Sequence, residues 1–212
     1  MSGHKKTAIK IINKSKIMNE SKKKQPWVAK KYEAQESRDL SLFKQFVKVF
    51  PLNTFLTAAT NYNCQCDTVS SNETGGTCAW ELKLRSKHTL ACEDLMIEPG
   101  KFEYLMRLWK EKGIWSFYLN FFEGTNIAYL FFIPGLEDNA DKLTVKKNMR
   151  IRYDGGAGTK VEDRVFLPWK YGYKLNIKTG EILEYAQDNK AVPAPKSLGL
   201  DFSKIIDCKE LI

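Results

Sequence analysis

Alternating hydrophobic and charged residues mark the run from Trp80 to Arg85, and this alternation predicts a β-strand with two unlike faces. In a strand, the apolar side chains of Trp80, Leu82 and Leu84 would face one way. The opposite face would carry Glu81, Lys83 and Arg85. A turn-prone stretch at 70–77 precedes the run, so 78–85 is expected to be the second strand of a hairpin whose first strand lies within 55–67.

Two stretches with apolar residues at helical spacing predict helices on either side of this hairpin, at 32–50 and 101–112. A proline follows the first stretch and a glycine the second. The almost continuously apolar run 114–122 predicts a strand covered on both faces, and 127–133 predicts the next strand. The order helix, strand, strand, helix, strand, strand predicts an α/β fold with a mixed central sheet flanked by helices.

The character of the sequence changes after residue 135, and we expect 32–135 to form the core and 136–212 a C-terminal elaboration of the same domain. A strand is expected to end near Trp169. The glycine-rich stretch 155–160 lacks the spacing of a phosphate-binding loop, so we interpret it as a hairpin or flexible loop. A basic cluster either braces a nucleic-acid backbone or is a solvated face; it consists of Lys146, Lys147, Arg150 and Arg152.

Charge is distributed very unevenly along the 212 residues. The formal net charge of +9 lies entirely in residues 1–31, which hold ten lysines and one acid, whereas the remaining residues hold 24 basic and 24 acidic side chains. So basic a segment, poor in aromatic residues, is expected to be a disordered arm. Its functional interpretation is sequence-independent, salt-sensitive attachment to phosphates. The alternative is a solubilising tail.

The compartment is inferred from targeting signals and cysteines. No apolar run reaches the length of a membrane helix, and the N-terminus lacks the apolar core of a signal peptide. We therefore expect a soluble cytoplasmic protein without a membrane partner. Five cysteines are an odd number, so buried thiols are expected. A zinc site is the alternative, although the spacing of Cys64, Cys66, Cys78 and Cys92 lacks paired knuckles.

Candidate chemistry lies at Asp67, Glu81 and Lys83. An acid and an amine on one face of a strand, with a second acid from a neighbouring strand, can hold a divalent metal against a phosphodiester. The acid-x-lysine spacing is not specific by itself, because it recurs at 20–22, 188–190 and 207–209. A solvated strand face therefore stays the alternative.

Asp67, the run Glu81-Leu82-Lys83 and the element order resemble the PD-(D/E)XK nuclease superfamily, especially resolvase-like and restriction-like members from phages and bacteria. The resemblance covers about 33–133, and Cys66 stands where the pattern has proline. It implies that Asp67 and Glu81 bind Mg²⁺, with Mn²⁺ as a substitute, together with the backbone carbonyl of Leu82.

The resemblance also implies that Lys83 assists the attacking water, and it adds Glu36 from the first helix and Lys101 from the helix after the motif. The implied function is a metal-dependent DNA endonuclease, with nucleic acid as partner and a homodimer as a possible assembly. One alternative is a non-catalytic nucleic-acid-binding or virion-associated structural protein on the same scaffold. Another is an interaction protein whose arm binds acidic partners.

Overall fold

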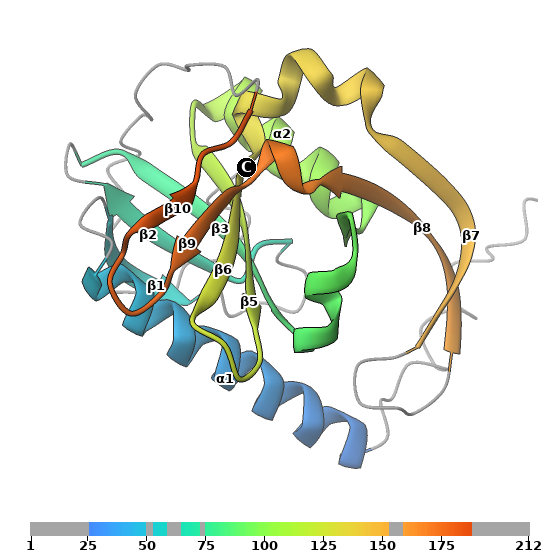
Figure 1. The fold of residues 1–212 in the computed structure, drawn as a ribbon, viewed down its shortest axis with the longest axis horizontal. Coiled ribbons are helices and arrows are strands. Elements are labelled where there is room, and N and C mark those ends of the chain that lie inside the picture. The colour runs from blue at the N-terminus through green and yellow to red at the C-terminus, as the bar shows by residue number, and fades with distance from the viewer. Residues whose placement is uncertain (1–25, 50–52, 59–64, 73–74, 153–158, 188–212) are drawn as a thin grey trace, which may run out of the picture.

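Two β-sheets form the framework of the part of the chain that the computed structural model describes, which comprises residues 26–49, 53–58, 65–72, 75–152 and 159–187. The larger sheet has the strand order β1-β2-β3-β5-β6-β9-β10 and the smaller one β4-β8-β7 (Figure 1). Only the β3–β5 pair of the larger sheet is parallel. The mixed α/β architecture predicted from the sequence is confirmed.

The elements have the following bounds. The helices are α1 (Pro26–Val49) and α2 (Pro99–Lys112), with 3₁₀ segments η1 (Lys87–Ala91), η2 (Ile133–Lys142) and η3 (Trp169–Tyr171). The larger sheet contains β1 (Asn53–Ala58), β2 (Thr68–Asn72), β3 (Thr77–Arg85), β5 (Trp115–Phe122), β6 (Ile127–Phe132), β9 (Tyr173–Asn176) and β10 (Ile182–Glu184). The smaller sheet contains β4 (Asp94–Ile97), β7 (Thr144–Arg152) and β8 (Thr159–Pro168).

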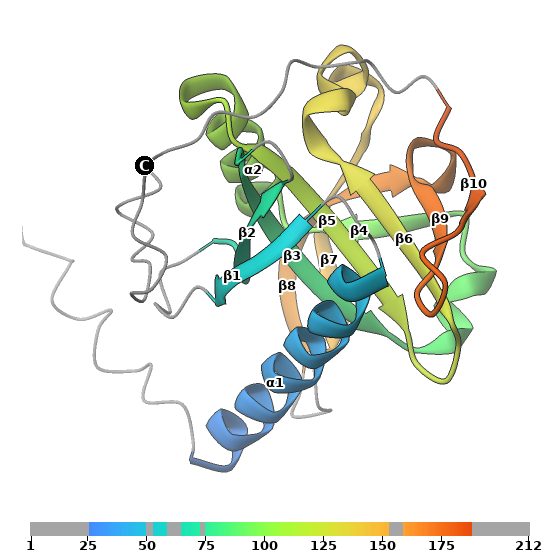
Figure 2. The same cartoon turned by 90° about the vertical axis from the view of Figure 1, so that its left-hand side faces the viewer.

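Helix α1 covers one face of the larger sheet (Figure 2). Phe43 and Phe46 of α1 are fully buried, and the ring centroid of Phe43 lies 4.9 Å from that of Trp80. Trp80 in turn stacks on Phe117 of β5 at 4.3 Å. The helix begins at Pro26, six residues before the start predicted from the sequence. Proline is favoured in a first helical turn, and lysines favour a helix without giving it an apolar stripe.

Helix α2 and the smaller sheet cover the opposite face. Leu105 and Leu108 of α2 belong to one buried cluster with Leu95 of β4 and Leu167 of β8. As predicted, the helix ends at Gly113, whose φ of 67° is left-handed and whose N–H bonds to the carbonyls of residues 108 and 109. Helix α2 is also the crossover that makes the parallel pairing of β3 with β5 possible.

The predicted hairpin exists, but its first strand is displaced along the sequence. β2 contains two serines that the sequence placed in the turn, and Asp67 lies just before this strand instead of at the end of one. Ser70 is fully buried, and its hydroxyl accepts a hydrogen bond from the indole N–H of Trp80 at 2.7 Å. A buried indole needs such an acceptor, so tertiary packing overrides the turn propensity of serine.

The C-terminal strands join both sheets. β9 pairs with β6 and extends the larger sheet, whereas β8 pairs with both β4 and β7. None of the described helices combines the length and apolar character needed to cross a membrane. The predicted arm up to position 25, the glycine-rich stretch at 155–158 and residues from 188 onward, including the last cysteine, lie outside the described residues, as does Cys64.

Candidate functional site

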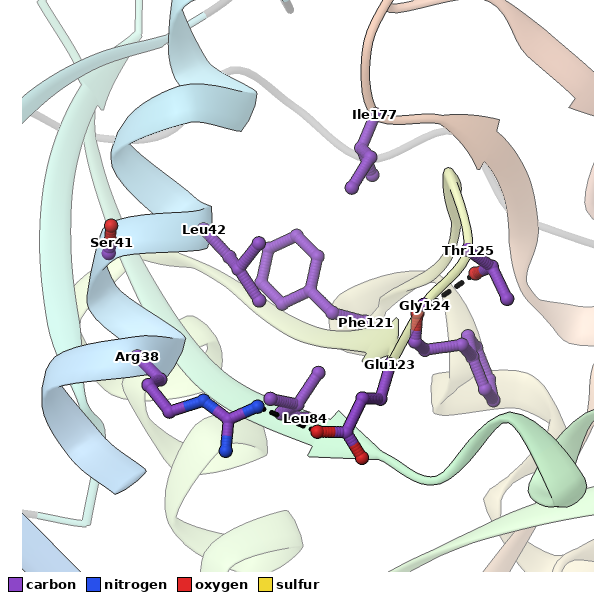
Figure 3. A pocket seen from close by; sticks show the side chains of 10 residues that line it. Arg38, Ser41, Leu42, Leu84, Phe121, Glu123, Gly124, Thr125 and Ile177 are labelled. Atoms are coloured by element: carbon purple, nitrogen blue, oxygen red, sulfur yellow. Dashed lines mark hydrogen bonds and ion pairs between the residues drawn. The ribbon is translucent and has the colours of Figure 1, made fainter. Parts of the chain in front are cut away.

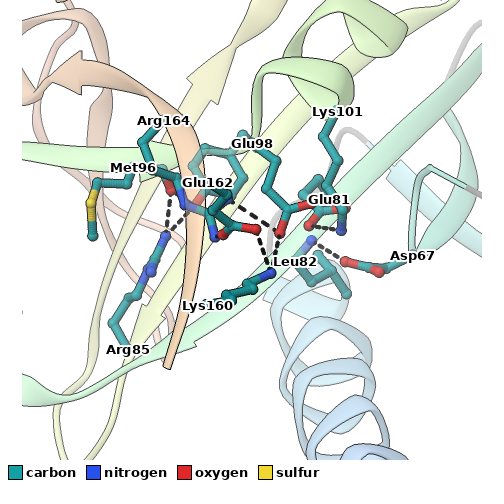
Figure 4. A network of polar contacts seen from close by, with 11 residues as sticks. Asp67, Glu81, Leu82, Arg85, Met96, Glu98, Lys101, Lys160, Glu162 and Arg164 are labelled. Atoms are coloured by element: carbon teal, nitrogen blue, oxygen red, sulfur yellow. Dashed lines mark hydrogen bonds and ion pairs between the residues drawn. The ribbon is translucent and has the colours of Figure 1, made fainter. Parts of the chain in front are cut away.

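The two unlike faces that the alternation predicted exist, and the charged face of β3 turns toward α2, away from α1. Trp80, Leu82 and Leu84 belong to the apolar cluster under α1. On the other side, the carboxylate of Glu81 is fully buried, and its Oε1 accepts a hydrogen bond from the ammonium group of Lys101 (Figure 4). Lys101 lies in the first turn of α2, so the helix brings this ammonium group onto the strand.

Asp67 is held against the middle of β3 by two hydrogen bonds. Its backbone N–H donates to the carbonyl of Trp80 at 2.8 Å, and its Oδ2 accepts from the backbone N–H of Leu82 at 2.7 Å. In a strand the N–H and C=O of one residue point to the same edge, so the carbonyl of Leu82 lies on the Asp67 side of β3. Asp67 and Glu81 therefore flank the same peptide of β3.

Burial and the charge of a neighbouring carboxylate together raise the pKa of Glu81. Desolvation and then Asp67 raise the pKa of Glu81 to about 8, although Lys101 and Lys83 act in the opposite direction. Its second carboxyl oxygen, Oε2, is buried and has no hydrogen-bond partner among the described residues. A buried carboxyl oxygen without a partner, close to a second carboxylate, is a suitable donor for a hard cation such as Mg²⁺.

Both lysines of the site keep their protons at neutral pH. Burial disfavours the ammonium group of Lys83, but the carboxylates of Glu81 and Asp67 outweigh this effect and its pKa is raised. The pKa of Lys101 is also raised, because Glu81 and then Asp67 outweigh its burial. Lys83 can therefore orient a ligand or stabilise negative charge, but it is not suited to accept a proton from water.

A second ionic network continues from this cluster, and the sequence analysis did not identify it. Glu98 lies just before α2, and its Oε1 is 3.2 Å from Arg164 Nη1 and 3.7 Å from Lys160 Nζ, both on β8 (Figure 4). Burial would raise the pKa of Glu98, but Lys101, Lys160 and Arg164 together lower it. An acid directly before a helix was the available sequence signal, whereas no local pattern shows that β8 lies beside it.

Arg85 anchors the far end of the charged face of β3. Its Nε donates to Oδ1 of Asn120 at 3.1 Å, and its Nη2 donates to the carbonyl of Met96 at 2.7 Å and also to the hydroxyl of Tyr118. These contacts connect β3 to β5 and β4. Arg85 thus supports the strand that carries Glu81 and Lys83.

The structure brings together four of the five candidate side chains, namely those of Asp67, Glu81, Lys83 and Lys101. Glu36 lies within α1, but its side chain is not among those described, so its role stays a prediction. No group of three or more His, Cys, Asp and Glu side chains suited to a metal ion occurs in the described ranges.

Two of the three cysteines in the described part of the chain are buried thiols. Cys66 directly precedes Asp67, and burial followed by the charges of Asp67 and Glu81 raises the pKa of its thiol. Cys78 is also buried and its pKa is raised to about 12, again mainly by burial, whereas Cys92 is exposed. Raised pKa values keep the two buried sulfurs protonated, and thiolate is the form that reacts or binds metal.

A pocket of about 300 Å³ lies on the other face of the larger sheet, between α1 and the turn after β5 (Figure 3). Arg38 and Glu123 form an exposed ion pair of 2.7 Å at its rim, and its floor includes Leu42 and Phe121. The pocket shares no residue with the carboxylate cluster on β3. It therefore does not form part of the candidate site.

No protein-family model and no curated protein matches this sequence. Among solved structures, the chain is similar to Hjc, a Holliday junction resolvase from the archaeal hyperthermophile Archaeoglobus fulgidus. The alignment covers 67% of this chain and 96% of that one, with 14% sequence identity and a TM-score of 0.40.

Proposed function

We propose that this protein is a metal-dependent endonuclease of the PD-(D/E)XK type that hydrolyses phosphodiester bonds in DNA. The observation that carries the proposal is the position of Asp67, whose carboxylate is hydrogen-bonded to the N–H of Leu82 between Glu81 and Lys83. This arrangement gives two acids and an amine around one peptide of β3. These are the groups that the resemblance assigned to catalysis.

The donor set suits a divalent ion. Asp67, Glu81 and the carbonyl of Leu82 would hold Mg²⁺ or Mn²⁺, because all three offer the oxygen ligands that these ions prefer. The partnerless Oε2 of Glu81 supports this assignment, since a cation would satisfy it. When bound, the ion supplies a Lewis acid that polarises a phosphoryl oxygen and lowers the pKa of coordinated water.

The two lysines have separate roles in this proposal. Lys83, which stays protonated, orients the attacking water and stabilises the negative charge that develops on the phosphate. Lys101 balances the buried charge of Glu81 and positions that carboxylate. The two ammonium groups offset the charges of Asp67 and Glu81 even when both acids are ionised, so a phosphodiester approaching the site meets no net negative charge.

Cleavage assays test the proposal directly. Purified protein with Mg²⁺ or Mn²⁺ should cut supercoiled plasmid or branched DNA, and Glu81→Gln or Lys83→Met should lower the rate by about 100-fold or more while DNA binding persists. The matched controls are Glu123→Gln and Lys178→Met, which change an exposed acid and an exposed lysine elsewhere and should cut normally. Equal cutting by wild type and Glu81→Gln would contradict the proposal.

A specific observation also favours a second function, that of a non-catalytic nucleic-acid-binding protein. Glu81 is fully buried and already paired with Lys101, so the site is electrostatically satisfied on that side. This alternative predicts DNA binding without cleavage of linear, supercoiled or junction DNA. It also predicts no Mn²⁺ binding in a calorimetric titration, whereas the nuclease proposal predicts Mn²⁺ binding that Glu81→Gln weakens.

A further inference from the structure

Within the smaller sheet, strands β7 and β8 continue beyond the end of β4 as a two-stranded ribbon. β4 pairs with β8 only from Val165 to Pro168, whereas the β7–β8 pairing extends as far as Arg152 opposite Thr159. We call residues 144–152 and 159–164 the basic ribbon. It appears in Figure 1 as a curved pair of strands at the right, separate from the larger sheet.

Positive charge is concentrated on one strand of this ribbon. β7 contains four basic residues and no acidic one, although the chain beyond residue 31 has equal numbers of both. Lys146, Lys147 and Arg150 are exposed. On β8 the charges balance, with two basic and two acidic residues in 159–164. The ribbon therefore carries a local excess of positive charge, although residues 32–212 taken together are neutral.

The pairing register separates the ribbon into an inner and an outer face. Residues opposite one another share a face, so Arg150 and Val161, which is 63% exposed, lie on the outer one. A bulge follows Lys146, with Asn148 at a φ of 53°, and its N–H donates to Oδ1 of Asp163 at 2.9 Å. The bulge alters the direction of the strand at this point.

The inner face attaches the ribbon to the candidate site. Arg164 and Lys160 form ion pairs with Glu98, and Lys160 Nζ also lies 2.6 Å from Glu162 Oε2 (Figure 4). Glu98 interacts electrostatically with Lys101, which contacts Glu81. A chain of contacts thus runs from the base of the ribbon to the carboxylates that would bind the metal.

We propose that the basic ribbon binds the sugar-phosphate backbone of double-stranded DNA beside the site, an inference that rests on the proposed nuclease function. Lysine and arginine neutralise phosphates without reading sequence. At about 3.3 Å per residue the nine residues of β7 span roughly 30 Å, which is close to one turn of B-DNA. The major groove of B-DNA also admits a two-stranded ribbon, whereas that of duplex RNA is too narrow.

Binding without catalysis tests the ribbon separately from the nuclease site. The test variant is Lys147→Gln with Arg150→Gln in the full chain, and the matched control is Lys170→Gln with Lys178→Gln, which removes the same charge from exposed positions outside the ribbon. Affinity for a labelled duplex is measured in EDTA over about 50 to 200 mM salt. The slope of log affinity against log salt should fall in magnitude by about 1.8 for the test variant only.

Three results would overturn the proposal: an unchanged slope in the ribbon variant, an equal change in the control, or an equal loss of affinity for single-stranded DNA or duplex RNA.

Charged residues on the edge strand β7 also discourage pairing with other chains. If preventing such pairing were their only role, the ribbon variant would aggregate but would keep the salt slope of the wild type. Circular dichroism verifies that both variants are folded. If the salt slope falls in the ribbon variant but the wild-type protein never cuts DNA, the nuclease proposal is refuted and the ribbon's role in DNA binding stands.

Discussion

At the scale of single residues, Glu81 determines much of the behaviour of the site. A carboxylate that is fully buried would be strongly unfavourable without compensation. Lys101 supplies an opposite charge, and Asp67 adds a like charge that raises the pKa of Glu81. Such an arrangement is costly for folding alone, and a shared cation would explain why the two acids are kept together.

The pair of Glu81 and Lys101 predicts a pH-dependent stability. With its pKa raised to about 8, folded Glu81 holds a proton that the unfolded chain loses near pH 4.3, so its contribution to stability falls as pH rises between these values. Lys101→Met removes an influence that lowers the pKa of Glu81, which extends this fall to higher pH. We expect Lys101→Met to lower the free energy of unfolding by roughly 3 kcal/mol at pH 9 and by less at pH 6.

Urea unfolding at the two pH values measures this effect. Lys110→Met is the matched control, because Lys110 forms a largely exposed ion pair with Glu137 at 3.3 Å. Exposed pairs contribute about 1 kcal/mol or less, so this variant should change little at either pH. If Lys101→Met lost the same stability at pH 6 as at pH 9, the assignment of the buried pair would be wrong.

At the scale of elements, the sequence predicted those features that depend on local pattern. The alternation in β3 correctly separated its apolar side chains from its charged ones, and the glycine at 113 correctly marked the end of α2. Asp67, Glu81, Lys83 and Lys101 meet as expected because a hairpin and the next helix place them together. These relations span short stretches of chain.

Features that depend on distant partners were not predictable in this way. β4 has four residues and is stabilised by pairing with β8, whose residues lie about 70 positions later. The pairing of β9 with β6 also joins residues that are far apart in the sequence, such as Ile127 and Asn176. Glu98 gains its partners Lys160 and Arg164 only through these contacts, so no periodicity in its neighbourhood could reveal the network.

The packing of α1 on β3 predicts a large effect of truncating one aromatic residue. Phe46 is fully buried and its ring centroid lies 6.4 Å from that of Trp80 and 6.4 Å from that of Phe121. Phe46→Ala should cost about 3 to 5 kcal/mol in the free energy of unfolding. Chemical denaturation measures this value.

The control for this change is Val161→Ala, which removes an apolar side chain that is 63% exposed and should cost about 0.5 kcal/mol or less. A similar small loss for Phe46→Ala would mean that α1 does not pack on β3 as described.

At the scale of the whole molecule, positive charge lies in two separate places, the N-terminal segment and the basic ribbon. Residues 1–25 contain eight lysines and one acid. If this segment contacts phosphates, its deletion should reduce the magnitude of the salt slope of DNA binding while α1, which begins at Pro26, is retained. Titrations of the truncated and full-length proteins at several salt concentrations measure the change.

An unchanged slope together with lower solubility would instead identify the segment as a solubilising tail. Combining the deletion with Lys147→Gln and Arg150→Gln should give additive changes in slope, because the segment and the ribbon are expected to contact different phosphates. If the combined variant changed the salt slope no more than the deletion alone, only one of the two regions would bind DNA.

Anomalous diffraction from crystals grown with Mn²⁺ above pH 8, where Glu81 is deprotonated, shows directly whether Asp67 and Glu81 share a metal ion. We expect a single strong peak with carboxyl oxygens of both Asp67 and Glu81 at about 2.1 Å, the distance typical of Mg²⁺ and its oxygen ligands. A peak that contacts only one of these carboxylates, or none beside β3 while Lys101 still pairs with Glu81, would contradict a shared metal site.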